Sequence, residues 1–294
     1  MKTIYSRYNR FRKEEFQVET RIVTDGSTRY VVKKALTAAA NKHIDDIISN
    51  GARLTGSMKG SRVKLPAVIE KGPDHIRSEF IEGVSLEKMA LEALIAKDKD
   101  RFLSLIDDYK LMLYGSFLTD KKPPSSLSSS PLFKGVDPSA LPPELECLKY
   151  PVIDPILENF IIKDGVYYLV DYEWTLGSDV PVAFVLYRGL LYFYKKYKAL
   201  NIEKFIPFTD ILARYGITGK AAMQYQKMED TFQDYAIGDN KGIRRRYLKK
   251  QFRFDDSIRP LLVTKERSPR LYGFILWLAS AAQKLRTALK LDGQ

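Results

Sequence analysis

The chain has 294 residues, enough for one large or two modest domains, and 45% of them are hydrophobic, which is ordinary for a soluble globular protein. One cysteine excludes a disulfide framework and a cysteine-based metal site, and two widely separated histidines, His43 and His75, give little support to zinc catalysis or a Ser-His-Asp triad. The net charge of +12 suits anionic partners such as nucleotides, nucleic acid, phosphorylated glycans or an anionic membrane face, and suits a merely soluble basic surface equally well.

The first 36 residues predict two paired strands after a basic, aromatic beginning. Residues 1–16 are expected to form an irregular strand or arm. Apolar and polar residues alternate over 16–23, and a turn with Asp25-Gly26 leads to a second strand over 28–36. That strand contains Val31-Val32-Lys33-Lys34. One residue of register exchanges the faces of a strand, so the pattern leaves open which lysine points inward.

A helix is predicted next, over 38–48, with Thr37 as its N-cap and its isoleucines on one side. The Gly-, Ser- and Lys-rich stretch 50–64 predicts a mobile loop. Further strands are expected over 65–69 and 75–81. Further helices are expected over 86–96, 98–114, 182–200, 208–215, 221–235 and 243–254.

The Pro/Ser-rich stretch 119–143 interrupts this series and cannot be a helix or strand over its length. Such insertions in compact domains are functional lids or disordered segments. Because it lies just before the segment with Asp154 and Asn159, it is expected to be an acceptor-side loop, with disorder as the equal alternative.

The stretch 150–174, YPVIDPILENFIIKDGVYYLVDYEW, predicts a strand-turn-strand unit with polar ends. Its prolines forbid a continuous helix, and Asp164-Gly165 supplies the turn. Asp154 and Asn159 lie on the entry side, and Asp171 and Glu173 on the exit side. These oxygen-bearing side chains could hold Mg²⁺ and leave one Asp free to accept a hydroxyl proton, as in phosphoryl transfer.

The spacing of these residues resembles the protein-kinase-like superfamily, in particular its aminoglycoside/choline phosphotransferase branch and the kinase-like domains found beside bacterial polysaccharide glycosyltransferases. In that pattern a catalytic-loop Asp is followed five positions later by Asn, then by a hairpin and an Asp in an I-D-[FYW]-[DE] context. Asp154, Asn159 and Asp171 match in order and spacing. Pro181-Val182-Ala183-Phe184 and Arg188 also resemble the next helix of that family.

The resemblance implies an α+β, two-lobed kinase-like fold: a small antiparallel β lobe over 1–83 that binds nucleotide, and a larger helical lobe over 84–294. It implies ATP and Mg²⁺ as cofactors. Asp154 would orient and deprotonate the acceptor, Asn159 and Asp171 would hold Mg²⁺, and Glu173 would help with metal or acceptor.

The resemblance also assigns roles in the first lobe. Lys33, with Lys34 still open, would pair with nucleotide phosphates, because its strand resembles the V-A-I-K strand of kinases. Asp46, or Asp45, would be the acidic partner of that lysine. The segment 79–83, EFIEG, resembles the inter-lobe hinge, so Glu79 and Ile81 would contact adenine through backbone groups.

The departures from the family pattern keep a second function open. Val152 stands where the family usually has His, and Glu173 where protein kinases have Gly. No G-x-G-x-x-G precedes Lys33, so the loop covering the phosphates must be built on Asp25-Gly26-Ser27 or lie earlier. The implied function is phosphorylation of a hydroxyl, of a sugar in a surface polysaccharide or lipid-linked glycan. The alternative is a weak or inactive pseudokinase scaffold in a membrane-associated glycan-synthesis complex.

The C-terminal part adds a possible membrane contact. The apolar block 271–279 is too short to span a bilayer, but with the basic residues that follow, 271–290 could lie at a membrane interface or close the helical lobe. An N-terminus without an apolar segment predicts a cytoplasmic protein, at most peripheral at the inner membrane face. Nucleic acid is a third-ranked partner, because no nucleic-acid-binding motif accompanies the basic arm.

Overall fold

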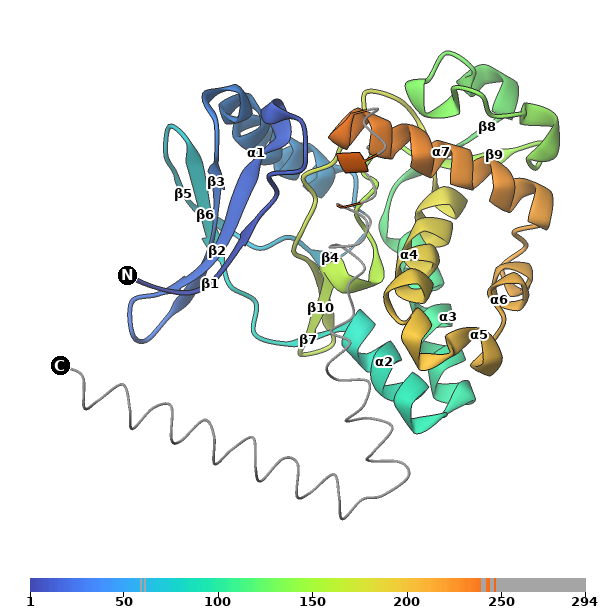
Figure 1. Ribbon diagram of the computed structural model, residues 1–294, viewed down its shortest axis with the longest axis horizontal. Coiled ribbons are helices and arrows are strands. Elements are labelled where there is room, and N and C mark those ends of the chain that lie inside the picture. Colours follow the sequence, from blue (N-terminus) through green and yellow to red (C-terminus); the bar gives the residue numbers. More distant parts are fainter. Residues whose placement is uncertain (59, 61, 239–241, 244–245, 247–294) are drawn as a thin grey trace.

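The computed structural model describes residues 1–58, 60, 62–238, 242, 243 and 246. An antiparallel sheet forms one end of the molecule and a helical region the other (Figure 1). This two-lobed α+β arrangement confirms the predicted fold class.

The first lobe is built on a five-stranded antiparallel sheet with the order β1-β2-β3-β6-β5. Its strands are β1 (Lys2–Tyr8), β2 (Val18–Thr24), β3 (Arg29–Ala35), β5 (Val68–Lys71) and β6 (His75–Glu79). Val18, Val32 and Ile76 are buried. These three residues come from neighbouring strands and contribute to the hydrophobic core of this lobe.

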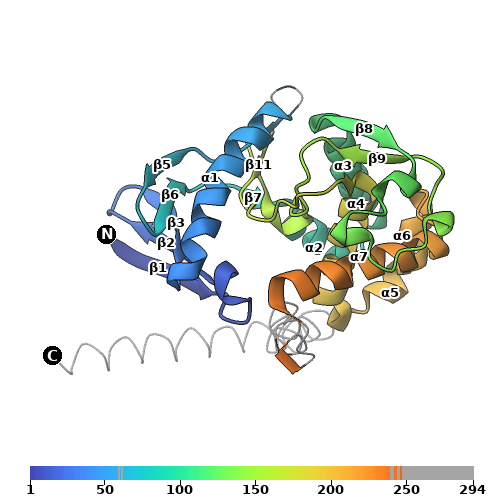
Figure 2. The same cartoon turned by 90° about the horizontal axis from the view of Figure 1, so that it is seen from above.

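Helix α1 (Asn41–Gly56) lies along one face of the sheet (Figure 2). A short 3-10 turn precedes it, and the Thr37 side chain accepts a hydrogen bond from the Ala40 N–H, so the predicted cap is present. The helix continues to Gly56, about two turns beyond its predicted end at residue 48, so the first part of the loop predicted from residue 50 is wrong. Leu54 is fully buried, and this tertiary contact outweighs the weak local propensity of Gly51 and Gly56.

A second sheet connects the two lobes, with the order β4-β11-β10-β7. Its strands are β4 (Val63–Lys64), β7 (Val84–Ser85), β10 (Phe160–Lys163) and β11 (Val166–Leu169). Strands β10 and β11 form the predicted hairpin, with φ of 50° at Asp164 and 75° at Gly165. Strand β7 follows β6 after four residues, so the predicted hinge segment connects the first sheet to this one.

The second lobe is a set of helices packed around α4. They are α2 (Leu86–Ala96), α3 (Lys99–Ser116), α4 (Val182–Lys196), α5 (Ile202–Phe205), α6 (Phe208–Arg214) and α7 (Gly219–Ile237). Nearly every residue of α4 from Phe184 to Tyr194 is buried, so this helix is the centre of the lobe. Ser85, Asp98 and Thr218 cap α2, α3 and α7 through their side chains.

The Pro/Ser-rich insertion has a defined path in the structure. It begins with β8 (Thr119–Lys122), which pairs with β9 (Leu145–Leu148), and β9 pairs with β12 (Val180–Pro181). Between β8 and β9 the chain makes three short 3-10 helices. Leu132 and Phe133 are buried, and the turn that contains them packs against α7. The segment therefore contributes to the core.

The helix expected over 243–254 and the block 271–290 lie outside the described residues, apart from Ile243 and Arg246. Within the described ranges, no helix has both the length and the apolar character that crossing a membrane requires.

Candidate active site

Two backbone segments meet at the entrance to the β10–β11 hairpin. Val152 forms an isolated antiparallel bridge with Thr175, and the Ile153 N–H donates to the Trp174 carbonyl at 3.1 Å. These bonds hold the segment that carries Asp154 beside the segment that carries Asp171 and Glu173. The hairpin thus returns the chain to its starting point, as the sequence pattern predicts.

Lys33 reaches this place from β3. Its Nζ lies 2.6 Å from Asp171 Oδ1 and 3.2 Å from Glu173 Oε2, and the residue is only 8% exposed. Burial opposes the charge of Lys33, but Asp171 and Glu173 together hold its pKa above the usual value. Lys34 points to the other face and pairs with Asp74 at 3.2 Å. The structure therefore places Lys33, and not Lys34, at the site.

Glu173 is the most enclosed carboxylate of the group. Arg12 Nη2 lies 2.6 Å from its Oε1, and Lys33 takes its Oε2. Burial by itself would raise the pKa of Glu173, but the cations Arg12 and Lys33 hold it well below the usual range. Because both carboxylate oxygens are occupied, Glu173 fits an anchor for two cations better than the expected helper of metal or acceptor. Nothing in the sequence pattern pointed to Arg12.

Asp154 is 5% exposed and forms an ion pair with Arg188, a buried arginine from α4. Arg188 Nη1 donates to Asp154 Oδ1 at 2.9 Å and to the Ile153 carbonyl at 3.0 Å. Burial is the largest of the causes that raise the pKa of Asp154 to about 7; Asp171 and Glu173 add to the rise, and Arg188 opposes it. A carboxylate with such a pKa can accept and release a proton near neutral pH.

Arg188 is itself held by a buried polar network between α4 and α7. Its Nε donates to Glu229 Oε2 at 2.9 Å and its Nη2 to the Tyr192 hydroxyl at 2.9 Å. The Tyr192 hydroxyl donates to Glu229, and the Gln233 side-chain amide donates to both. Arg188 and Tyr192, like Glu229 and Gln233, stand four residues apart on one helix face. A single arginine inside an apolar helix was the available sequence signal.

The side-chain amide of Asn159 is held by the backbone of Asp154. Its Nδ2 donates to the Asp154 backbone carbonyl at 3.0 Å, and no hydrogen bond to its side-chain oxygen is present within the described part of the chain. That oxygen and the Asp171 carboxylate, whose side chain is 35% exposed, are the kinds of ligand that Mg²⁺ prefers. The residues present therefore fit Mg²⁺, provided that phosphates and water complete the coordination. Considering only the placed residues, no group of three or more His, Cys, Asp or Glu side chains forms a metal cluster.

The expected pairing of Asp46 with Lys33 is wrong. Asp46 lies one turn from Lys42 on the outer side of α1, and Lys42 Nζ is 2.7 Å from Asp46 Oδ2. Asp45 pairs with Lys71 at 2.9 Å and does not reach the site either. Both aspartates pair with exposed lysines, and the acids that pair with Lys33 come from the loop after β11 instead.

Glu79 is the last residue of β6 and Ile81 lies in the segment between the two sheets, but their contact with adenine stays a prediction. The Glu79 N–H donates to the Ala67 carbonyl at 2.9 Å within the first sheet, and Ile81 is buried. Gly83 passes so close to β10 that an added Cβ would lie 2.4 Å from the Ile162 carbonyl oxygen. This glycine allows the connecting segment to pack against the hairpin.

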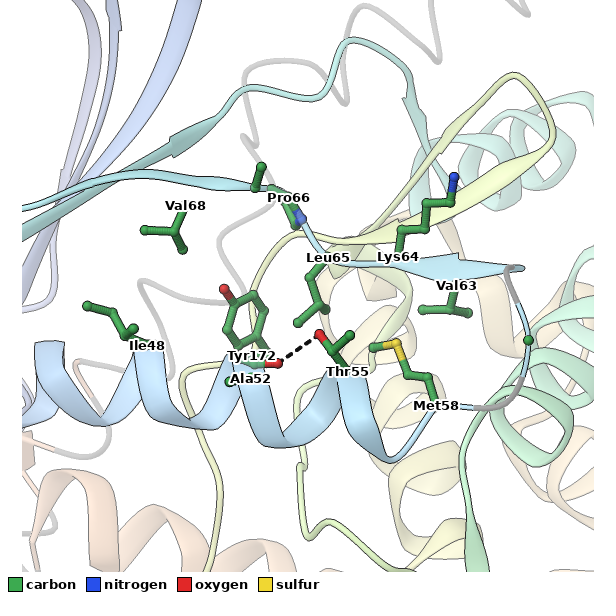
Figure 3. Close-up of a pocket in the computed structure, with 13 residues that line it drawn as sticks. Ile48, Ala52, Thr55, Met58, Val63, Lys64, Leu65, Pro66, Val68 and Tyr172 are labelled. Carbon is green, nitrogen blue, oxygen red and sulfur yellow. Dashed lines mark hydrogen bonds between the residues drawn. The ribbon is translucent and has the colours of Figure 1, made fainter.

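A pocket of about 560 Å³ lies next to the site, between α1 and the segment 63–68. Tyr172, which stands between Asp171 and Glu173, lies between these two elements (Figure 3). A Cβ at Gly51 would lie 3.1 Å from the Tyr172 ring, so the glycine permits this contact. Neither Asp154 nor Lys33 lines the pocket, and Tyr172 is the residue that connects it to the segment with Asp171 and Glu173.

No protein-family model matches this chain, and no curated protein matches it in sequence. Solved structures similar to it include a thermostable mutant of the aminoglycoside phosphotransferase APH(4)-Ia, with TM-score 0.45, 11% identity, and coverage of 83% of this chain and 90% of the other. For the macrolide 2′-phosphotransferase MphH from Brachybacterium faecium, the TM-score is 0.37 and the sequence identity 10%, with coverage of 83% of this chain and 91% of the other. For an ethanolamine kinase from Plasmodium vivax, the TM-score is 0.36 and the sequence identity 10%, with coverage of 84% of this chain and 80% of the other. By their names, two of these three proteins are phosphotransferases and one is a kinase.

Proposed function

We propose that this protein is an ATP- and Mg²⁺-dependent phosphotransferase that acts on a hydroxyl group. The observation that supports it is the meeting of Lys33, Asp154, Asn159 and Asp171 at one place from separate strands and loops. This set contains a cation for phosphates, oxygen ligands for a divalent metal and a carboxylate that can take a proton.

In the proposed reaction, Asp154 orients the acceptor hydroxyl and accepts its proton as the oxygen attacks the γ-phosphorus. The bond from the γ-phosphorus to the β–γ bridging oxygen breaks, and its electron pair leaves with ADP. Arg188 holds one oxygen of Asp154, so the other oxygen can face the acceptor. Asp171 and Asn159 would hold Mg²⁺, which supplies charge neutralisation at the phosphates. Lys33 would move from Asp171 to the phosphate oxygens.

The proposed acceptor is a sugar hydroxyl, of a surface polysaccharide or of a lipid-linked glycan. This narrower assignment is supported by the sequence resemblance to kinase-like domains of polysaccharide biosynthesis. The net charge of +12 is compatible with an acceptor that is itself anionic or lies at an anionic surface.

A binding protein without turnover is the second candidate. The 2.6 Å contact between Lys33 and Asp171 supports it, because this pair satisfies both groups without nucleotide or metal. Val152 in place of the usual His points the same way. In that case the protein would keep the fold, with or without a bound nucleotide, as part of a glycan-synthesis complex.

Thermal unfolding with ATP, with Mg²⁺ and with both tests the site. Ligand at about 100 times its Kd stabilises the native state by about 2.7 kcal/mol, or roughly 4 °C in Tm for a chain of this size. We expect this rise only when ATP and Mg²⁺ are present together. It should vanish in Asp171→Ala and persist in Asp120→Ala, a control that removes an exposed carboxylate from β8. The absence of any rise in the wild-type protein would exclude both the metal site and the nucleotide site.

Asp154→Asn separates the enzyme from the scaffold. The amide cannot accept the proton, so we expect ATP turnover to fall roughly 10²–10⁴-fold while the MgATP-dependent rise in Tm remains. The assay would follow two products: inorganic phosphate, released when water is the acceptor, and the phosphorylated form of each candidate glycan. Equal turnover in the two proteins would leave Asp154 without the proposed role, and no turnover in either protein would favour the scaffold.

A further inference from the structure

A second pocket lies beside helix α4, on a different side of the helix from Asp154. Its volume is about 270 Å³, and it is bounded by the C-terminal end of α3, strands β8 and β9, and the first turns of α7. Ala183 of α4 lines it, whereas Arg188 of the same helix holds Asp154. Five residues of helix turn the side-chain direction by roughly 140°, so these two residues point to different sides. Asp154 does not line the pocket.

Two tyrosines line this pocket with hydroxyl groups that have no partner in the protein. Tyr225 of α7 is 1% exposed, and its hydroxyl makes no hydrogen bond among the residues that the structure describes. The same is true of Tyr114 near the end of α3. Burial raises the pKa of both side chains, so both hydroxyls stay protonated at neutral pH. A buried polar group without a partner is unfavourable, and these two hydroxyls therefore offer hydrogen bonds to a ligand.

Carboxylates in and just before β9 supply the acceptors of the pocket. Glu144 and Glu146 both line it. Glu146 is half-buried and accepts one hydrogen bond, from the Thr119 hydroxyl at 2.7 Å, so it has lone pairs left for a ligand. Glu144 is exposed, and its ion pair with Lys121, which also lines the pocket, measures 3.7 Å. Two carboxylates and one lysine leave the pocket negative in a chain whose net charge is +12.

The aromatic walls of the pocket are held by contacts outside it. The Tyr215 hydroxyl donates to Asp107 at 2.9 Å, and Lys110 Nζ lies 5.7 Å from the centre of the Tyr215 ring. The Tyr225 ring packs against Tyr187 of α4, with ring centroids 5.8 Å apart. These side chains therefore keep their places without a ligand, which lowers the entropic cost of binding one.

We infer that this pocket binds one ring of a neutral carbohydrate and is a glycan-binding site apart from the proposed active site. Each hydroxyl of a sugar both donates and accepts hydrogen bonds, so a sugar can satisfy the phenols and the carboxylates together. The C–H groups of its ring can pack on the apolar surface that Pro142 and Ile217 supply. The inference does not depend on phosphoryl transfer.

Other classes of ligand fit the lining less well. An anion such as phosphate would meet the charges of Glu144 and Glu146, and an apolar molecule would leave the Tyr225 hydroxyl unpaired. The volume is near the lower limit of small-molecule sites, roughly 300 Å³, which restricts the occupant to about one ring at a time.

Methyl NMR titration of the full chain with glucose, galactose, mannose and N-acetylglucosamine tests the inference. At least one sugar should shift the methyl signals of Ile217, which lines the pocket. Tyr225→Phe removes only the unpaired hydroxyl, so the fold should stay intact while that sugar binds roughly 3- to 10-fold more weakly. Tyr194→Phe is the matched control, because the Tyr194 hydroxyl donates to the Ile206 carbonyl and does not line the pocket. This control should bind the sugar with the affinity of the wild type.

The methyl signals of Ile156, two positions after Asp154, report on the proposed active site in the same spectra. A sugar that shifts Ile156 alone, no shift of Ile217 with any of the four sugars, or equal affinity in Tyr225→Phe would overturn the inference. Tetramethylammonium is the probe for a cation site, and a shift of Ile217 by this ion but by no sugar would overturn it too. All these outcomes leave the proposed function intact, because no nucleotide is present. A protein that fails to bind MgATP would remove that function and leave the glycan site unaffected.

Discussion

Asp154 is the residue whose surroundings are most unusual. It is buried, it shares the Arg188 guanidinium with Glu229, and the carboxylates Asp171 and Glu173 act on it from the facing segment. Arg188 favours its ionised form, but burial and the two neighbouring carboxylates oppose it, and these raise the pKa of Asp154 to about 7. The side chain is thus held in one orientation and can change its protonation state near neutral pH.

This pKa predicts how activity depends on pH. Asp154 must be ionised to accept a proton, so ATP turnover should rise as the pH increases through about 7. Stability should change in the opposite direction: the folded state binds this proton more tightly than the unfolded chain does, so the contribution of Asp154 decreases from pH ~4 to pH ~7. Turnover from pH 5.5 to 8.5, with MgATP affinity measured at each pH as the control, checks this. A flat rate profile would contradict the assigned base.

At the scale of the element, helix α4 positions the loop around Asp154 through two adjacent residues. Arg188 holds the Asp154 side chain, and the adjacent Gly189 leaves room for Tyr109 of α3. The Tyr109 hydroxyl donates to the Pro155 carbonyl at 2.7 Å, and Tyr109 is fully buried. Two helices therefore fix consecutive residues of the same loop, one through a side chain and one through a carbonyl.

Substitutions at two helical glycines test this packing. A Cβ at Gly189 would lie 2.4 Å from the Tyr109 hydroxyl, so Gly189→Ala should displace Tyr109 from Pro155 and lower the free energy of unfolding by about 1–3 kcal/mol. Gly115→Ala in α3 is the control, because nothing lies within 4 Å of an added Cβ, and it should gain about 0.5–1 kcal/mol. Urea unfolding measures both. Similar values for the two variants would show that α4 can adjust at Gly189.

At the scale of the molecule, an aromatic cluster joins the two lobes. Trp174 contacts Phe16 and His43 on the side of the first sheet, and Phe232 and Tyr235 of α7 on the other, with ring centroids 5.0–6.2 Å apart. Trp174 follows Glu173 directly, so the same few residues close the site and connect the lobes. Relative movement of the lobes would have to break these contacts.

The cluster predicts how the protein unfolds. The wild type should show one calorimetric transition, whereas Trp174→Ala should lose about 3–5 kcal/mol and separate the unfolding of the two lobes into two transitions. Phe193→Ala is the control, because Phe193 is equally buried but packs on Phe102 and Tyr197 within the helical lobe. It should lower Tm and keep a single transition. One sharp transition for Trp174→Ala would mean that other contacts couple the lobes.

Local patterns in the sequence were sufficient for several of these features. The hairpin, its Asp164-Gly165 turn and the cap at Thr37 were predicted correctly, because strand alternation, positive φ and capping depend on residues a few positions apart. The same spacing gave the order Asp154, Asn159, Asp171, whose catalytic roles remain proposals. The length of α1 was not predicted, because its last turns depend on the burial of Leu54.

Only the tertiary structure decided which charged groups meet. Sequence distance does not reveal that Lys33 pairs with residues 138 and 140 positions later, that Asp46 turns outward, or that Arg12 enters the site. The periodicities of helix and strand state which face a residue occupies, whereas its partner is set by how distant segments pack together. Here the return of the hairpin beside Asp154, and the path of the loop 9–17 between the lobes, bring those charges into contact.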